Sequence, residues 1–221
     1  ACERATLVLI ETGRHDEAFE AWMHAAELAS QLGDGDRAQR ALDQATTLLP
    51  SVSDTLAAHR LARRRGLNAY REGDPLQALA RFLEALAIVR SSGDKGAWAI
   101  SENDLGVTYR HLGNYTQALG HFEASLGLRE ALDHDDLGAL MANIGTLYLE
   151  LGDLERSESY LTRALNDHRA GGRSLPAHRT LEDLGVLAWR RDDHDAARDL
   201  FDQAWEYYAD AGAVPDQSRL A

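Results

Sequence analysis

The chain has 221 residues, a formal net charge of −13, and 44% hydrophobic residues. No run approaches the eighteen or so apolar residues that a membrane-spanning helix needs, so we expect no membrane span. The acidic balance argues against nucleic acid as a partner of the surface as a whole. The single cysteine, Cys2, excludes an internal disulfide and favours a reducing, cytoplasmic location.

Apolar residues recur at helical spacing along almost the whole chain, and no segment shows the alternation with a period of two that a half-buried strand has. Glycine ends many of these segments, and Asp, Asn, Ser or Pro follows it, which is typical of one helix ending and the next beginning. The sequence therefore predicts about eleven helices, at residues 1–12, 15–32, 36–49, 53–72, 75–91, 95–112, 115–131, 135–151, 154–170, 176–191 and 194–211. We expect residues 171–176 to form the one longer connection.

A mid-helix glycine recurs at a nearly constant spacing. Gly66, Gly106, Gly145 and Gly185 lie 40, 39 and 40 residues apart. Fixed offsets after each glycine hold a turn residue, a small residue, a bulky apolar residue and a second small residue; after Gly106 these are Gly113, Ala118, Phe122 and Ser125. A fixed period of this size is typical of a solenoid, in which each repeat buries its apolar face against its neighbours. The small residues would admit the close approach of the second helix of each pair.

The order of Gly, Tyr, Gly, Ala, Phe and a small residue resembles the tetratricopeptide repeat, and it is fullest in residues 104–125. The resemblance extends over about 53–211, in the longer-helix variety found in bacterial signalling and regulatory proteins. It implies an all-α fold, a right-handed α-solenoid superhelix of antiparallel helix pairs. We expect irregular tetratricopeptide-like helices over 1–52, four helix pairs over 53–211, and the start of a truncated helix or a tail over 212–221.

No pattern in the chain supports catalysis or a metal centre. The nine histidines form neither His-x-x-x-His nor His-Glu-x-x-His, so a helical metal site has no local support. The phosphate-loop pattern and the Gly-x-Ser-x-Gly elbow are both absent. We therefore expect a chain that is not an enzyme and that carries no cofactor and no metal.

In the tetratricopeptide superhelix the first helix of each pair lines an inner groove, so the resemblance implies which side chains face a partner. The groove residues expected on this basis are Arg60, Arg63, Tyr70, Arg71, Asn103, Arg110, His111, Arg179, Trp189 and Arg190. A groove rich in arginine on an acidic chain would attract an acidic partner. The alternative is that Arg60–Arg65 is a solvated helical face whose arginines pair with neighbouring Glu and Asp.

We expect a non-catalytic interaction scaffold that holds an acidic and partly apolar peptide or protein segment in this groove. The resemblance places it in the regulatory arm of a larger bacterial signalling or transcription-regulatory protein. Two alternatives stay open: a small-molecule effector sensor, whose ligand would stack on Tyr70 and Trp189, and self-association through the terminal helices at 1–12 and 194–211. Neither nucleic acid nor a membrane is expected as a partner, and the oligomeric state stays open.

Overall fold

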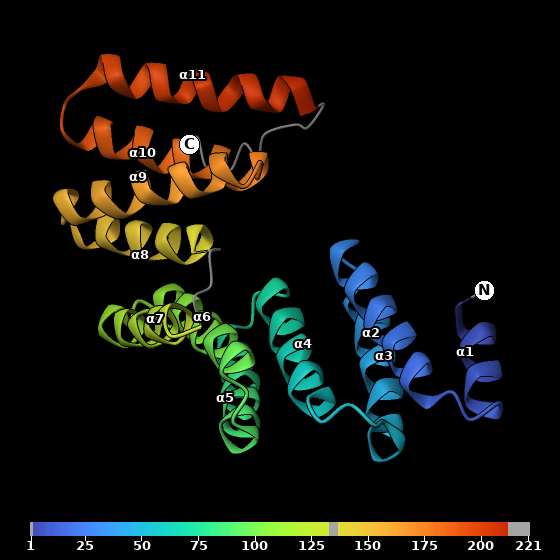
Figure 1. Ribbon diagram of the computed structural model, residues 1–221. Helices are drawn as coiled ribbons and strands as arrows, with labels where there is room; N and C mark the ends of the chain where they lie inside the picture. Colours follow the sequence, from blue (N-terminus) through green and yellow to red (C-terminus); the bar gives the residue numbers. More distant parts are fainter. Residues whose placement is uncertain (1, 133–136, 212–221) are drawn as a thin grey trace. The chain divides into compact units, whose positions relative to one another are not determined.

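The computed structural model describes residues 2–132 and 137–211, and every regular element in them is a helix (Figure 1). The eleven α-helices of this described part are α1 (Cys2–Glu11), α2 (His15–Gln31), α3 (Gly35–Leu48), α4 (Ala57–Arg71), α5 (Pro75–Ser92), α6 (Lys95–His111), α7 (Tyr115–Glu130), α8 (Gly138–Leu151), α9 (Leu154–Ala170), α10 (Ser174–Arg190) and α11 (His194–Ala211). A 3-10 turn, η1 (Leu49–Ser51), follows α3. The predicted all-α fold is confirmed, whereas the tail predicted at 212–221 lies outside the described residues.

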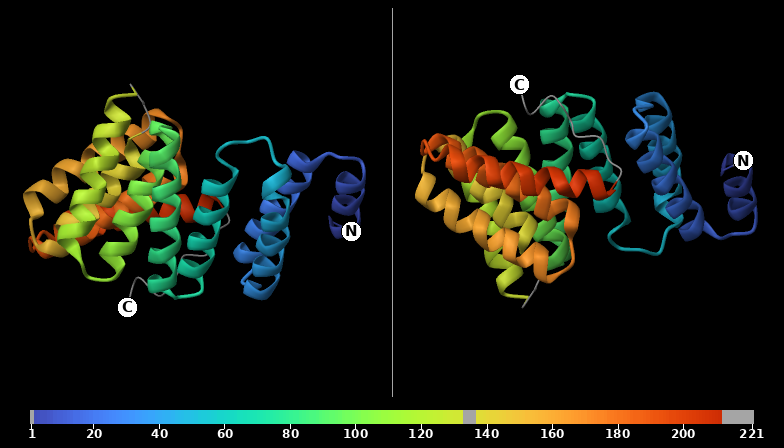
Figure 2. Two further views of the ribbon diagram at one scale, coloured as in Figure 1. Left: turned by 90° about the horizontal axis from the view of Figure 1, so that it is seen from below. Right: turned by 90° about the horizontal axis from the view of Figure 1, so that it is seen from above.

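The chain divides into two compact units, Ala1–Leu128 and Arg129–Ala221. In the first unit α2 packs against α3 and α4 packs against α5, and these two hairpins can be followed in both views of Figure 2. In the second unit α8, α9, α10 and α11 lie in sequence order, each in contact with the next (Figure 1). Helices that contact their neighbours in the chain are what a solenoid requires, because each repeat buries its apolar face against the adjacent one.

The helix ends follow the turn chemistry of the sequence. Five of the described helices begin after an aspartate whose carboxylate accepts a hydrogen bond from the backbone N–H three residues later; these aspartates are Asp34, Asp74, Asp94, Asp153 and Asp193. Gly152 ends α8 with a φ of 79°, in the left-handed region that glycine adopts without steric cost. At the equivalent place after α10 the chain has Asp192, which takes a φ of 60° although it carries a side chain.

Two predicted helix starts, at 53 and 176, are wrong, and each has a local cause; a third, at 135, lies outside the described residues, and α8 begins at Gly138. Helix α4 begins at Ala57 instead of 53, because the backbone N–H and the hydroxyl of Ser53 both donate to the Asp16 carboxylate of α2, at 2.8 and 2.9 Å. Helix α10 begins at Ser174 instead of 176, since Pro176 fits the first turn, where its missing N–H costs no hydrogen bond. The longer connection predicted at 171–176 is therefore reduced to residues 171–173, and a longer one, residues 49–56, joins α3 to α4.

In each of the four hairpins that carry the repeat, the mid-helix glycine lies against the bulky residue sixteen positions later. A Cβ added to Gly106 would lie 2.5 Å from the ring of Phe122, and one added to Gly145 would lie 2.7 Å from the Leu161 side chain. The same holds for Gly66 with Phe82 and for Gly185 with Phe201, at 2.6 Å each. The glycines thus set how closely the two helices of a hairpin approach.

The buried core is divided among clusters that follow the hairpins. In the first unit one cluster surrounds Phe19 and Leu42, and another surrounds Phe82 and Leu105. In the second unit a cluster surrounds Leu161. Full burial of a side chain of this size stabilises a fold by about 1.5–3 kcal/mol. Among the described helices, none combines the length and the apolar character that crossing a bilayer would require.

Replacing Gly106 with Ala tests the close approach within a hairpin. Ala is favoured over Gly inside a helix by about 1 kcal/mol, but the new Cβ would meet the Phe122 ring at 2.5 Å. We expect the clash to dominate and the free energy of unfolding, measured by urea denaturation, to fall by about 1–3 kcal/mol.

Gly120→Ala is the matched control, because nothing lies within 4 Å of a Cβ at that position on α7. Helix propensity alone should leave this variant as stable as the natural chain, or more stable by up to about 1 kcal/mol. Equal changes in the two variants would contradict the packing described above.

Candidate functional site

Polar side chains about one repeat apart join the first helices of successive hairpins, which in the first unit are α2, α4 and α6. The partners are separated by 37 to 42 residues in the sequence and comprise Glu20–Arg60, Glu27–Arg64, Ser30–Arg71, His59–Ser101, Arg63–Asp104 and Tyr70–His111. Because the separation matches the repeat, the same face of each first helix lies against the next. This face, on α2, α4 and α6, is called the ladder face below.

At the N-terminal end of α4 the arginines of the ladder face have acidic partners. Arg60 forms ion pairs with Glu20 and, at 3.2 Å, with Asp54. Arg64 pairs with Glu27 at 3.1 Å. These contacts leave little uncompensated positive charge in this part of the face.

The remaining two arginines of the same run are paired as well. Arg63 pairs with Asp104 of α6, whose side chain is only 8% exposed, and Arg65 pairs with Asp43 of α3 at 3.2 Å. Each of the four arginines between residues 60 and 65 is therefore paired with an acidic residue. Arg60 and Arg63 do belong to the face that the sequence predicts, but their charges are balanced within the protein.

A hollow of about 420 Å³ opens on the ladder face between α2, α4 and α6. Three carboxylates and three guanidinium groups line it, together with His24 and His59; the charged residues are Glu20, Glu27, Asp94, Arg60, Arg63 and Arg64. The apolar part of the lining consists of Met23, Leu56, Ala97 and Ile100. The hollow combines balanced charge with apolar surface, where the sequence predicts a net basic groove.

His59 lies at the base of this region and is 3% exposed. Its Nε2 lies 2.9 Å from the Ser101 hydroxyl. Burial lowers the pKa of His59 below its ordinary value, the charges of Arg63 and Arg60 lower it further, and Asp94 opposes them. The ring is therefore neutral at neutral pH.

At the C-terminal ends of α4 and α6 the ladder face has a different character. The hydroxyl of Tyr70 lies 3.4 Å from Nδ1 of His111, and the two rings meet edge to face at 5.3 Å. Arg71 is exposed and donates to the hydroxyl of Ser30 at 3.2 Å, and no acidic group of the described residues pairs with it. Tyr70, Arg71 and His111 are called the Tyr70 patch below.

Two further predicted residues, Asn103 and Arg110, lie half-buried on α6, and each already has an interaction partner. The first unit thus places together seven of the predicted residues: Arg60, Arg63, Tyr70, Arg71, Asn103, Arg110 and His111. Among these, the Tyr70 patch offers an exposed cation without an ionic partner in the described part of the chain.

The other three predicted residues lie on α10 in the second unit. Arg190 donates to the backbone carbonyl of Leu149 on α8, so it joins neighbouring first helices as the ladder contacts do. Arg179 is exposed, and Trp189 is 59% exposed with its ring centroid 4.5 Å from that of His194. Trp189 is therefore available for an aromatic contact, as the sequence predicts for a groove residue.

Sequence reasoning missed a buried carboxylate in the first unit. Glu102 of α6 is 2% exposed and accepts hydrogen bonds from Trp98 at 2.6 Å and from Arg90 at 3.0 Å, while Nδ1 of His121 lies 2.6 Å away. Burial alone would raise the pKa of Glu102, but the hydrogen bonds with His121, Trp98 and Arg90 outweigh it and hold the pKa below its ordinary value. No sequence motif marks this glutamate, since one Glu in a helix resembles any surface residue.

Among residues 2–132 and 137–211, no group of three or more His, Cys, Asp or Glu side chains is arranged to hold a metal ion. The polar groups on the ladder face instead bond to one another across neighbouring helices. Such an arrangement offers hydrogen bonds, ion pairs and apolar contacts to a bound molecule.

The sequence matches the tetratricopeptide repeat family over residues 54–131, 99–170 and 139–210, which together span well over half of the chain. The chain belongs to the tetratricopeptide repeat family. Of the three helices of the ladder face, α4 and α6 lie within the matched residues, and α2 precedes them.

One relative in sequence and several solved structures resemble the chain. It is 24% identical over 203 residues to the protein kinesin light chain-related 3 of Arabidopsis thaliana; this covers 87% of the chain but 31% of that relative. Its fold matches BtubC (BKLC) from P. vanneervenii with a TM-score of 0.79 and 20% identity, over 97% of the chain and 94% of that protein. It also matches a signal transduction ATPase with a tetratricopeptide repeat sensor from Pyrococcus horikoshii, with a TM-score of 0.74 and 19% identity, over 94% of the chain and 35% of that protein.

His59→Gln tests the buried histidine through the pH dependence of stability. Because the pKa of His59 is lowered in the folded protein, the unfolded chain takes up a proton below pH 6.5 that the folded chain does not. The stability that the neutral ring contributes is therefore present above this pH and is lost as the pH falls.

We expect the urea midpoint to fall less between about pH 7.5 and about pH 5.5 in His59→Gln than in the natural chain, since glutamine does not titrate. Some dependence should remain, because burial also lowers the pKa of His178. An unchanged slope in the variant would show that the pKa of His59 is the same in the folded and the unfolded chain, and would contradict the lowered pKa.

Proposed function

We propose that this chain is a non-catalytic protein-interaction module whose ladder face binds a partner segment carrying both acidic and apolar side chains. The observation that carries the proposal is the juxtaposition, on one face of α2, α4 and α6, of a hollow with apolar lining and the cationic Tyr70 patch. The regular spacing of first helices offers an extended segment several contacts in succession.

An acidic side chain of the partner would bind at the Tyr70 patch. Arg71 can grip a carboxylate with two parallel hydrogen bonds, and its present partner, the Ser30 hydroxyl, carries no charge. His111 is exposed beside it, and Tyr70 adds an aromatic surface. Aromatic and arginine side chains are the residues that most often carry the binding energy of a protein interface.

Arg71 and His111 also lie in the last turns of their helices, where a cation interacts favourably with the helix dipole. This structural role is worth about 0.3–1 kcal/mol for an exposed residue. If Arg71 binds the partner, its substitution lowers the affinity for the partner, whereas a small change in helix stability does not. A binding experiment therefore separates the binding role from the structural role.

An apolar side chain of the partner would enter the hollow. Ile100, which is 36% exposed, lines it together with Leu56 and Ala97. The paired charges around these residues hold their positions by ion pairs and form the polar rim that protein interfaces commonly have around an apolar centre.

We place the module in the regulatory arm of a larger bacterial signalling or transcription-regulatory protein acting in the cytoplasm. Support comes from the fold shared with the Pyrococcus protein, in which a tetratricopeptide repeat sensor belongs to a signal transduction ATPase. The net charge of −13 supports a protein partner over nucleic acid.

A second candidate function is that of a small-molecule effector sensor. The hollow on the ladder face has a volume of about 420 Å³, which is in the range of ligand pockets in proteins. The third candidate, self-association, is favoured by Trp205 on α11, which is 56% exposed.

The proposed function is tested with two fluorescein-labelled peptides, one of alternating glutamate and leucine and one of alternating lysine and leucine. Non-specific attraction to a chain of net charge −13 would favour the lysine peptide. We expect saturable binding of the glutamate peptide in fluorescence anisotropy, and weaker binding of the lysine peptide.

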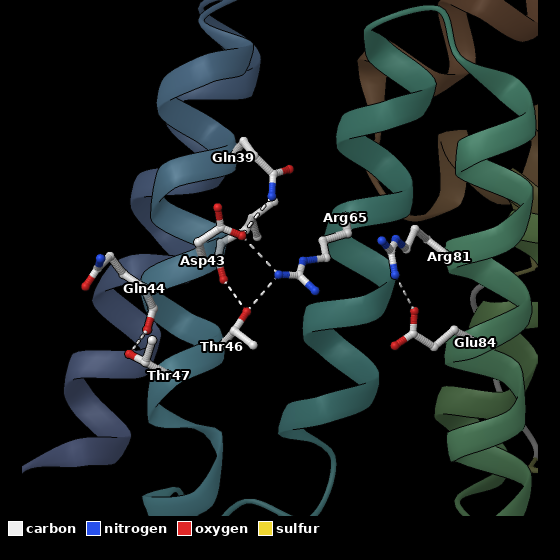
Figure 3. Close-up of polar contacts among 9 residues, drawn as sticks. Gln39, Asp43, Gln44, Thr46, Thr47, Arg65, Arg81 and Glu84 are labelled. Carbon is white, nitrogen blue, oxygen red and sulfur yellow. Dashed lines mark hydrogen bonds and ion pairs between the residues drawn. The ribbon is translucent and has the colours of Figure 1, made fainter.

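Arg71→Glu should weaken binding of the glutamate peptide about tenfold or more, because it replaces the attracting cation by an anion. Arg81→Glu makes the same charge change on α5, where Arg81 pairs with Glu84 away from the residues of the Tyr70 patch, and should leave the affinity unchanged (Figure 3). Stronger binding of the lysine peptide, or equal effects of the two variants, would contradict the proposed site.

A further inference from the structure

A second hollow of about 420 Å³ lies in the first unit between α1, α2 and α3, and it shares no lining residue with the hollow on the ladder face. Its walls are Leu7 from α1, Trp22 and Ala25 from α2, and Arg37, Arg40, Ala41, Asp43 and Gln44 from α3. Three helices enclose it, and its volume is in the range of small-molecule sites. We call it the Trp22 pocket.

The floor of the Trp22 pocket is apolar. Trp22 is 8% exposed and Ala41 is 3% exposed, whereas Leu7 on the opposite wall is 56% exposed. The indole N–H of Trp22 is buried and has no acceptor among the described residues. A buried donor without an acceptor is uncommon in native proteins, so a water molecule is expected to bind the indole N–H.

The rim of the pocket carries two cations without counterions. Arg37 and Arg40 are three residues apart on α3, so they lie on the same side of the helix, and both are exposed. No acidic group of the described part of the chain forms an ion pair with either guanidinium. The arginines at 60, 63, 64 and 65 in the same unit all have such partners.

The one carboxylate in the lining does not supply the missing counterion. Asp43 Oδ1 accepts a hydrogen bond from Gln39 at 2.9 Å and one from Arg65 of α4 at 3.2 Å. Figure 3 shows Asp43 and Thr46 pointing toward Arg65, while Gln44 points to the other side of α3. The charge of Asp43 is therefore compensated across the α3–α4 contact, and Arg37 and Arg40 remain available to an anion.

We propose that the Trp22 pocket binds a small amphipathic carboxylate, whose alkyl or aryl group packs on Trp22, Leu7 and Ala41 while its carboxylate pairs with Arg37 and Arg40. The apolar floor selects against a fully hydrated anion such as phosphate, because phosphate has no apolar group to pack against Trp22, Leu7 and Ala41. The guanidinium pair selects against a neutral or cationic amphiphile. The walls on three sides suit a compact ligand better than an extended protein segment.

Isothermal titration calorimetry of the whole chain with octanoate, acetate and octylammonium tests this proposal. Octanoate carries both features of the ligand, acetate lacks the apolar group, and octylammonium reverses the charge. We expect saturable binding of octanoate with a Kd below about 10 mM, and no saturable binding of the other two. Absence of octanoate binding, or equal binding of octylammonium, overturns the proposal.

Two variants locate the site. Arg37→Glu combined with Arg40→Glu should weaken octanoate binding about tenfold or more. Gln44→Trp, at an exposed position of the wall, should block the pocket without changing its charge and should give a similar loss. Circular dichroism establishes that each variant is folded.

Arg81→Glu combined with Arg198→Glu carries the same charge change as the rim variant at arginines outside the pocket, and it should bind octanoate as the natural chain does. Arg71→Glu, which tests the ladder face, should also retain octanoate binding. The two proposed sites are therefore tested independently of one another. Octanoate binding that survives both the rim variant and Gln44→Trp places the ligand elsewhere and overturns the proposal.

Discussion

The contact between a mid-helix glycine and the bulky residue sixteen positions later is the constraint on which the hairpins of this protein depend. A side chain on Gly66, Gly106 or Gly185 would overlap an aromatic ring, and one on Gly145 would overlap Leu161. The absence of a Cβ therefore lets two helices approach until the ring fills the space between them. Because this contact recurs with a period of about forty residues, successive hairpins within a unit present the same face to one another.

That periodicity explains which charged residues of the first unit form ion pairs with one another. When equivalent faces stack, a residue on one first helix lies beside a residue about one repeat away, and Arg63 with Asp104 or Arg60 with Glu20 follows from this spacing. Ion pairs formed in this way balance the arginines near the N-terminal end of α4. Arg71 on the ladder face and Arg37 with Arg40 at the Trp22 pocket are among the cations without acidic partners in the described residues, and the two binding proposals rest on them.

Much of the fold could be predicted from the sequence because its signals are local and repeated. Helical periodicity, glycine at helix ends and aspartate at helix starts locate the helices, and the spacing of the glycines identifies the hairpins. The start of α4 could not be predicted, because it depends on the distant contact between Ser53 and Asp16. The start of α10 differs for another reason, since the sequence favours Pro176 as the first helical residue although proline fits anywhere in the first turn.

The candidate site was predictable only in outline. The repeat pattern indicates which helices carry the face, and seven of the expected side chains lie on α4 and α6. The pairing of the α4 arginines was not predictable, because their acidic partners lie on neighbouring helices and have the same sequence pattern as ordinary surface residues. Glu102 is the clearest case, since its burial and its three polar neighbours on α5, α6 and α7 depend on packing that no local motif reports.

The central claim is that the Phe122 ring occupies the space that a Cβ at Gly106 would need. A double-mutant cycle of Gly106→Ala with Phe122→Ala, measured by urea denaturation, tests this claim most directly. Removing the ring alone should cost about 3–5 kcal/mol, but it also removes the group that the new Cβ would strike. The account predicts that the double variant loses less stability than the sum of the two single variants, by about 1–3 kcal/mol. Losses that add to within about 0.5 kcal/mol would show that the two positions are independent and would contradict it.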